Sequence, residues 1–99
     1  MKIGLDATTI KRFKNMPKGF EKRFCHPNEL LLLEKEKHKA DFLASIWAIK
    51  EALFKADNNF ADFRKIELKK DQHGWEHSDW NIATTNEGDL VIAVVVKKE

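Results

Sequence analysis

The sequence contains few cysteines and no long apolar run, and each of these absences excludes a class of protein. Its only cysteine is Cys25, so no disulfide can form within the chain, which suits a reducing compartment. The longest apolar runs, 30–33 and 90–96, are far too short for a helix that spans a bilayer. The first residues include an early acid and no apolar signal core. We therefore expect no export and no membrane contact, and a cytoplasmic location.

A strong charge of either sign is also missing. The formal net charge is only +2, and the basic residues are spread along the chain, so a nucleic-acid partner is not expected. Hydrophobic residues make up 42% and charged residues 34% of the 99 residues, a balance typical of a folded protein. The length predicts a single domain, 1–99. A core this small favours stabilisation by oligomerisation.

Two helices are predicted in the first 60 residues. The first begins at Pro27, because proline suits the first helical position, and Glu29 favours the positive end of the helix dipole. We expect the leucines at 30–33 to form its buried face. The second runs from about 40 to 57, where apolar residues recur at helical spacing. Alanines at every fourth position from 40 to 56 form a thin ridge that allows another element to approach closely.

Strand patterns occupy the start and the last third of the chain. Residues 1–6 predict a short strand, and alternating or β-branched runs predict strands at 65–70, 80–84 and 90–96. Turn sequences at 71–74 and 86–89 separate them, which predicts an antiparallel meander. The pattern at 10–20 stays open between helix and loop. Together these elements predict an α+β fold, with two main helices packed on a small antiparallel sheet.

Two charged residues fall on or beside the apolar face of the second helix. At about 100° per residue, Lys50 lies among the apolar side chains and Glu51 lies at their border. From the pattern alone, the favoured interpretation is that the Lys50 stem reaches solvent and that Glu51 pairs with Lys55 one turn later. This arrangement would be structural and would carry no chemistry.

The motifs that contain these residues support a different interpretation. Gly4-Leu5-Asp6 and the segment 47–56 (Trp-Ala-Ile-Lys-Glu-Ala-Leu-Phe-Lys-Ala) resemble the two signature motifs of phosphopantetheinyl transferases, most closely those of the small holo-acyl-carrier-protein synthase type. Segments 10–13, 20–24, 29–30, 42–44 and 88–95 resemble further parts of that family, in the family's order. The resemblance covers most of the chain and implies the 4'-phosphopantetheinyl transferase fold.

The resemblance implies a reaction and a set of roles. Family members use Mg²⁺ to move the phosphopantetheine arm of coenzyme A to a serine of an acyl or peptidyl carrier protein. Asp6 and Glu51 match the two carboxylates that hold the metal and serve catalysis. The other implied roles are coenzyme A binding by Lys55, Lys50, Asn86 and Thr85, and contact with the acidic carrier protein by Arg12 and Arg23. A subunit contact is the alternative for Lys50, and a solvated surface position is the alternative for the two arginines. The small relatives also imply a homotrimer.

Two segments depart from the family pattern. Residues 57–62 contain no glycine where the family has a glycine-rich loop near coenzyme A, and Asn86 and Leu90 stand where it commonly has histidine and tyrosine. The metal carboxylates are unaffected, whereas the contacts to coenzyme A are altered. A second interpretation therefore stays open, in which the chain is a weak or inactive relative that binds the carrier protein without transferring the arm. A third is an α+β interaction domain whose motifs are coincidental.

A second possible metal site lies in the turn region 71–79. Its acidic residues together with His73 and His77 are ligand types for transition metals, but their spacing matches no closed zinc site. A solvated turn is the favoured interpretation. Trp75 and Trp80 are expected to serve packing or an interface rather than base stacking, because no basic stripe accompanies them.

Overall fold

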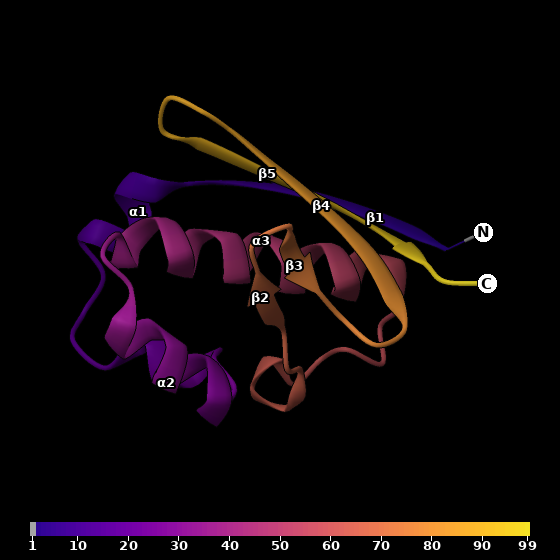
Figure 1. The fold of residues 1–99 in the computed structure, drawn as a ribbon, viewed down its shortest axis with the longest axis horizontal. Coiled ribbons are helices and arrows are strands. Elements are labelled where there is room, and N and C mark those ends of the chain that lie inside the picture. Colours follow the sequence, from indigo (N-terminus) through magenta and orange to yellow (C-terminus); the bar gives the residue numbers. More distant parts are fainter. Residues whose placement is uncertain (1) are drawn as a thin grey trace.

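Helix α3 (Lys39–Ala56) is the centre of the molecule, and a three-stranded sheet lies across one side of it (Figure 1). The computed structural model describes residues 2–99. In chain order the other elements are β1 (Ile3–Thr9), α1 (Ile10–Lys14), the 3₁₀ helix η1 (Phe20–Arg23), α2 (Pro27–Lys35), the 3₁₀ helix η2 (Phe63–Lys65), β2 (Lys69–Asp71), β3 (Gly74–Glu76), β4 (Trp80–Glu87) and β5 (Leu90–Lys97). The predicted α+β class is confirmed.

The strands of the sheet lie in the order β1-β5-β4, and both neighbouring pairs are antiparallel. The first strand of the chain therefore pairs with the last, and β4 and β5 form a hairpin. Strands β2 and β3 make a separate two-stranded ribbon around the turn predicted at 71–74. The predicted meander is thus correct for β4 and β5 but incomplete, since β1 joins the sheet and the short ribbon does not.

The strand register decides which side chains face α3. Asp6 lies opposite Ala93, and Ala93 lies opposite Thr84 on the next strand. Residues directly opposite each other share a face, and successive residues alternate between faces. Ala93 is fully buried against the helix, so Asp6 and Thr84 also point to that side. Leu5 points away from α3 and is 60% exposed.

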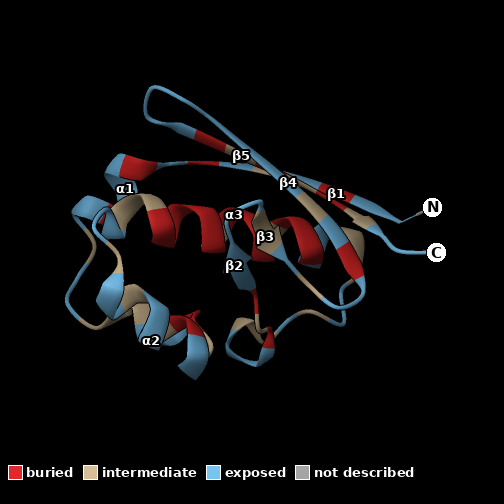
Figure 2. Ribbon diagram, viewed as in Figure 1, coloured by how far each residue is buried: buried red, intermediate tan, exposed pale blue. Residues whose placement is uncertain are grey.

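The ridge of alanines on α3 allows β1 to lie directly on the helix. Ala44, Ala48 and Ala52 are fully buried, in keeping with the predicted close approach (Figure 2). The contact is closest at Gly4, where a Cβ atom would lie 1.9 Å from the carbonyl oxygen of Ala52. Only glycine fits this position, and that fixes the position of β1 along α3.

Helix α2 differs from its prediction. It begins at Pro27 as expected, with a capping box between His26 and Glu29. However, Leu31 and Leu32 are 59% and 37% exposed, and in this helix only Glu29 is classed as buried. Leu30 and Leu33 are half-buried and pack against the core, so the predicted leucine face is correct for these two residues and wrong for Leu31 and Leu32. The helix lies beyond α3, away from the sheet, and is covered on one edge only (Figures 1 and 2).

The strand predicted at 65–70 forms only in its last part. Ile66 and Leu68 are buried, but the chain around them is a 3₁₀ turn followed by an irregular stretch, and β2 begins only at Lys69. The packing role expected for the tryptophans is confirmed: Trp80 is 1% exposed, and the Trp75 ring lies 5.2 Å from the ring of Phe42. Within residues 2–99, no helix has the length and apolar character needed to cross a membrane.

Candidate active site

The two predicted metal ligands come from elements that pack on each other. Asp6 lies on β1 two residues after Gly4 and on the same face, and its side chain is 12% exposed. Glu51 lies on α3 next to Ala52, the residue that Gly4 contacts, and it is partly exposed. Asp6 therefore lies two residues from the Gly4–Ala52 contact on β1, and Glu51 lies one residue from it on α3.

Lys55 completes this group of charges. Its Nζ donates to Asp6 Oδ1 at 2.8 Å and to the carbonyl oxygen of Leu5 at 3.3 Å. The hydrogen bond to Asp6, the charge of Asp6 and the more distant charge of Glu51 all raise the pKa of Lys55 above its ordinary value. Among the ion pairs of residues 2–99, Lys55 is joined to Asp6 and not to Glu51. The helical pair expected from the pattern alone is replaced by one between elements.

Asp6, Glu51 and Lys55 form a charged cluster. Its two carboxylates provide oxygen ligands, which an ion such as Mg²⁺ prefers. Mg²⁺ is usually held by one or two carboxylates and completes its shell with waters and substrate phosphates. Across residues 2–99 no group of three or more His, Cys, Asp and Glu side chains is placed to enclose a metal, so any site here is open. In addition, the Oγ1 atom of Thr8, on the same face of β1, is buried and has no hydrogen-bond partner among residues 2–99. The residues present therefore fit the ion.

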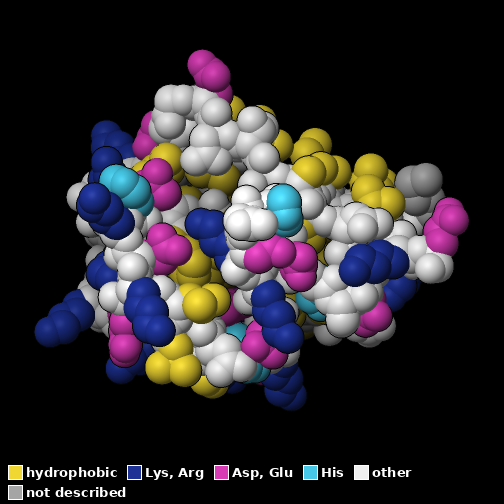
Figure 3. Space-filling view, in the orientation of Figure 1, with side chains coloured by type: hydrophobic (Ala, Val, Ile, Leu, Met, Phe, Trp, Pro, Cys, Tyr) yellow, Lys and Arg dark blue, Asp and Glu magenta, His cyan; other side chains and the backbone are white. Residues whose placement is uncertain are grey.

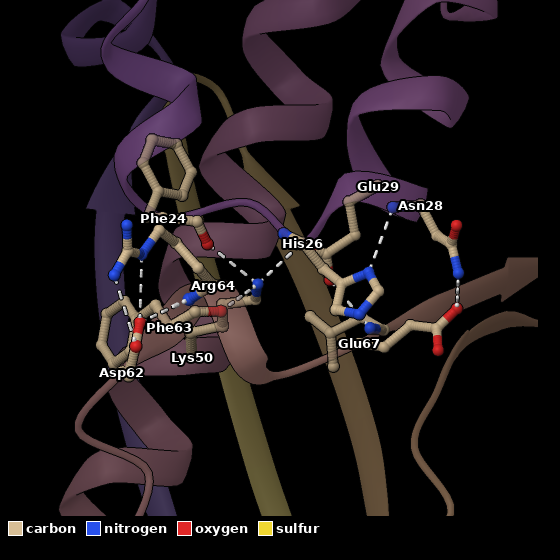
Figure 4. Close-up of polar contacts among 10 residues, drawn as sticks. Phe24, His26, Asn28, Glu29, Lys50, Asp62, Phe63, Arg64 and Glu67 are labelled. Carbon is tan, nitrogen blue, oxygen red and sulfur yellow. Dashed lines mark hydrogen bonds and ion pairs between the residues drawn. The ribbon is translucent and has the colours of Figure 1, made fainter.

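Lys50 occupies a quite different environment (Figure 4). It is fully buried, and its Nζ donates to Glu29 Oε1 at 2.6 Å, to the carbonyl oxygen of Phe63 at 2.7 Å and to that of Phe24 at 2.9 Å. Burial lowers the pKa of Lys50, and the Glu29 carboxylate opposes that change. All three N–H groups are satisfied inside the protein, so neither a reach to solvent nor contact with a coenzyme A phosphate fits this geometry.

Glu29 is the partner that the sequence did not reveal. Its Oε1 also accepts from the backbone N–H of His26 at 2.8 Å, and its Oε2 accepts from that of Leu68 at 2.8 Å. The Lys50–Glu29 pair therefore joins α3 to the start of α2, to the end of η1, to the start of η2 and, through Leu68, to the chain after η2. These are structural connections behind the site rather than contacts to a ligand.

Thr85 and Asn86 lie on β4 and are exposed, but they point to opposite faces of the sheet. Asn86 shares the α3 side with Thr84, and both line a cavity of about 310 Å³ with residues from the start of α3 and with Lys70. Thr85 lies opposite Ile92 on the outer face. Within one chain, Thr85 and Asn86 therefore do not face the same ligand.

Arg12 and Arg23 lie on either side of an aromatic surface near α1 and η1. The Arg12 guanidinium lies 5.2 Å from the ring centre of Trp47, and that of Arg23 lies 5.6 Å from the ring centre of Phe20. Arg12 lines a cavity of about 300 Å³, and Arg23 lines a neighbouring one of about 620 Å³. Trp47 and Phe20 line both cavities.

The aromatic surface also includes residues that the sequence reasoning missed. Phe63 and Arg64 line the larger cavity, although they follow Trp47 by some 16 residues in the chain. The sequence signal for this surface is the set of aromatic residues at positions 20, 24, 47 and 63. Their rings pack against one another and form one cluster. In contrast, the side chains of the 71–79 turn are used locally: Asp71 accepts from the N–H of His73, and His77 accepts from that of Asp79.

Comparison with known proteins identifies the family. Residues 2–95 match the 4'-phosphopantetheinyl transferase superfamily. The holo-[acyl-carrier-protein] synthase of Mycoplasma mobile is 50% identical over 97 residues, which cover 98% of this chain and 89% of that protein. The crystal structure of the holo-[acyl-carrier-protein] synthase from Neisseria meningitidis superposes with a TM-score of 0.84 at 26% identity and covers 99% of this chain and 98% of that one.

The fold is shared more widely than the sequence. A holo-(acyl-carrier-protein) synthase from Bacillus anthracis, solved in complex with CoA (3',5'-ADP), gives a TM-score of 0.83 at 24% identity, covering 97% of this chain and 94% of that one. The chain belongs to the 4'-phosphopantetheinyl transferase superfamily. Within that superfamily its relatives are the small holo-[acyl-carrier-protein] synthases, as the motifs predicted.

Proposed function

We propose that this chain transfers the 4'-phosphopantetheine arm of coenzyme A to a serine of an acyl or peptidyl carrier protein, with Mg²⁺. The observation that carries the proposal is the Gly4–Ala52 contact, which lies two residues from Asp6 and one residue from Glu51 in a chain of this superfamily. The 50% identical relative, named holo-[acyl-carrier-protein] synthase, supports the same activity. We treat residues 1–99 as one transferase domain that acts in the cytoplasm, which suits its single buried cysteine.

In the reaction, the serine hydroxyl oxygen forms a bond to the phosphorus that carries the pantetheine arm, and the bond from that phosphorus to adenosine bisphosphate breaks. Asp6 and Glu51 would hold the metal, and Glu51 is the candidate base that accepts the serine proton. When bound, Mg²⁺ would neutralise charge on the leaving phosphate. Lys55 is half exposed beside Asp6, where its ammonium group is available to a phosphate oxygen.

We assign carrier docking to the aromatic surface between Arg12 and Arg23. The two guanidinium groups provide positive charge for an acidic carrier, and the neighbouring cavities provide apolar contact around Trp47. Arginine and aromatic side chains are the residue types that most often dominate the energy of protein interfaces. Asn86, in the cavity beside the start of α3, is the remaining candidate for a coenzyme A contact on the α3 side of the sheet.

A homotrimer is part of the proposal, and its support is the outer face of the sheet. On this face Ile3 and Leu5 are 57% and 60% exposed, and Leu90 is 38% exposed. Ile92 lies between them in the register. Hydrophobic side chains are visible along this upper edge of the molecule in Figure 3. A contiguous apolar surface of this kind marks a protein contact.

The proposal is tested by incubating the protein with coenzyme A, Mg²⁺ and carrier proteins from the same organism. Intact-mass spectrometry should show the carrier gaining the mass of the arm, and chelation of the metal should prevent the gain. Asp6→Asn should slow the gain. Asp79→Asn is its matched control and should not, because it removes an exposed carboxylate remote in sequence from both motifs. No mass gain on any of the organism's carriers, at high enzyme concentration, would reject the proposal.

The second candidate function is carrier binding without transfer. It is favoured by Asn86 in place of the family histidine and by the loop 57–62, where Asp57 is bound to Lys2 and to the N–H of Asn59. Calorimetry separates the two candidates. The binding module predicts carrier affinity with no measurable affinity for coenzyme A, so Mg²⁺-dependent binding of coenzyme A would reject it.

A further inference from the structure

The ion pair between Lys55 and Asp6 has a consequence for metal binding. Lys55 Nζ lies 2.8 Å from Asp6 Oδ1, an oxygen of the carboxylate assigned to Mg²⁺. An ammonium group at hydrogen-bond distance occupies that oxygen and repels a divalent cation. We propose that Lys55 is a competitor for the metal: it stands in for Mg²⁺ at Asp6 in the ligand-free protein and leaves when a pyrophosphate arrives. This inference rests on the proposed function.

The surroundings of the two side chains explain why the pair is both formed and reversible. Asp6 is held on a strand and is only 12% exposed, so its carboxylate gains from a fixed partner. The Lys55 side chain is 54% exposed, and its only other acceptor within residues 2–99 is the carbonyl oxygen of Leu5 at 3.3 Å. A flexible, half-exposed lysine can exchange a carboxylate for a solute phosphate without burying its own charge, and the metal then neutralises the Asp6 carboxylate that it leaves. Lys50, with three buried partners, lacks this freedom.

The charge of the cluster then depends on where Lys55 lies. With Lys55 on Asp6, the two carboxylates and the ammonium group sum to one negative charge, which attracts Mg²⁺ weakly. When Lys55 turns to the pyrophosphate of coenzyme A, both carboxylates are free for the metal. Coenzyme A and Mg²⁺ should therefore each strengthen the binding of the other, as thermodynamic linkage requires. Part of that coupling belongs to Lys55 itself, in addition to direct contact between metal and phosphate.

The test measures Mg²⁺ affinity without turnover. Lys55→Met removes the ammonium group and keeps a stem of similar length, and Lys2→Met is the matched control, because Lys2 precedes β1 and pairs with Asp57 rather than with Asp6. Mg²⁺ is titrated into each protein alone, and binding is followed by the amide NMR shifts of Asp6 and Glu51. We expect Lys55→Met to bind Mg²⁺ about fivefold tighter than wild type, the upper end for a partly exposed ion pair. Lys2→Met should match wild type.

A second titration with coenzyme A present completes the test. Coenzyme A should tighten Mg²⁺ binding in the wild type, and this tightening should be about fivefold smaller in Lys55→Met. Equal Mg²⁺ affinities for the wild type and Lys55→Met, with shifts at Asp6 and Glu51 in both, would overturn this inference and leave the proposed function standing. If Mg²⁺ shifts neither residue in any variant, with or without coenzyme A, the proposed metal site fails and the inference fails with it.

Discussion

The buried Lys50–Glu29 pair gives the sharpest stability prediction. Lys50→Met removes the ammonium group and keeps the apolar stem, so the cavity stays filled. The Glu29 carboxylate then loses its cation and keeps only the backbone N–H groups of His26 and Leu68. The carbonyl oxygen of Phe24 loses its donor as well, whereas that of Phe63 keeps the backbone N–H of Ile66 at 3.2 Å. The variant thus leaves one uncompensated charge and one unpaired acceptor around α3.

The expected cost is large for a domain of this size. Leaving one member of a buried ion pair without its partner costs about 3–5 kcal/mol. A domain of this size has a total stability of about 5–15 kcal/mol, so the loss is a substantial fraction of the whole. The unfolding midpoint should fall by at least about 12 °C at roughly 4 °C per kcal/mol.

The assay is urea and thermal unfolding followed by circular dichroism, at one fixed protein concentration because assembly would add to the apparent stability. Lys22→Met, at an exposed lysine of η1, is the control and should stay within about 0.5 kcal/mol of wild type. Lys50→Met/Glu29→Gln should lose less than the sum of the two single variants, because it leaves no unpaired charge. A Lys50→Met protein within about 1 kcal/mol of wild type would contradict the buried geometry and favour a lysine that reaches solvent.

Three further predictions follow from the fold. Gly4→Ala should destabilise the protein by about 1–3 kcal/mol or more in urea unfolding, because its Cβ would meet the Ala52 carbonyl; unchanged stability would show that β1 does not lie so close to α3. Burial raises the pKa of Cys25 from 9.0 to about 12, so the unfolded thiol ionises first and stability falls as pH rises. Between pH 9 and 10 the wild type should lose about 1 kcal/mol more than Cys25→Ala, and parallel pH profiles would contradict the shift. Leu5→Lys places a charge on the outer face and should lower the mass measured by light scattering from that of the proposed trimer to that of a monomer, whereas an unchanged mass would exclude this face as the contact.

Several elements could be predicted because their signal is local. Helix α3 and the β4–β5 hairpin carry their periodicity within a few residues, and Pro27 and Glu29 mark the start of α2 by their own chemistry. The alanines of α3 predicted the close approach of another element, although not that Gly4 would be the point of contact. The proposed pairing of Asp6 with Glu51 has no local signal and rests on the order of the motifs.

Other features could not be predicted because they depend on contacts between distant residues. Lys50 was placed correctly on the apolar arc of α3, but its partner lies 21 positions earlier, on another helix. Lys55 has an acid one turn away on its own helix, yet it binds Asp6, which lies 49 positions away. The four leucines of α2 look like one core face, and the exposure of Leu31 and Leu32 follows only from the position of that helix beyond α3. In each case the three-dimensional arrangement outweighed the local pattern.

We propose that Asp6 and Glu51 act as one metal site in arm transfer, and a double-mutant cycle on kcat/KM can test this proposal. Asp6→Asn and Glu51→Gln should each lower kcat/KM at saturating Mg²⁺ by about 100-fold or more, since each removes a carboxylate from the ion. Residues that work as a unit are strongly non-additive. The double variant should therefore have a kcat/KM little lower than that of either single variant. Losses that multiply in the double variant, or a Glu51→Gln enzyme that keeps the wild-type rate and Mg²⁺ dependence, would contradict it.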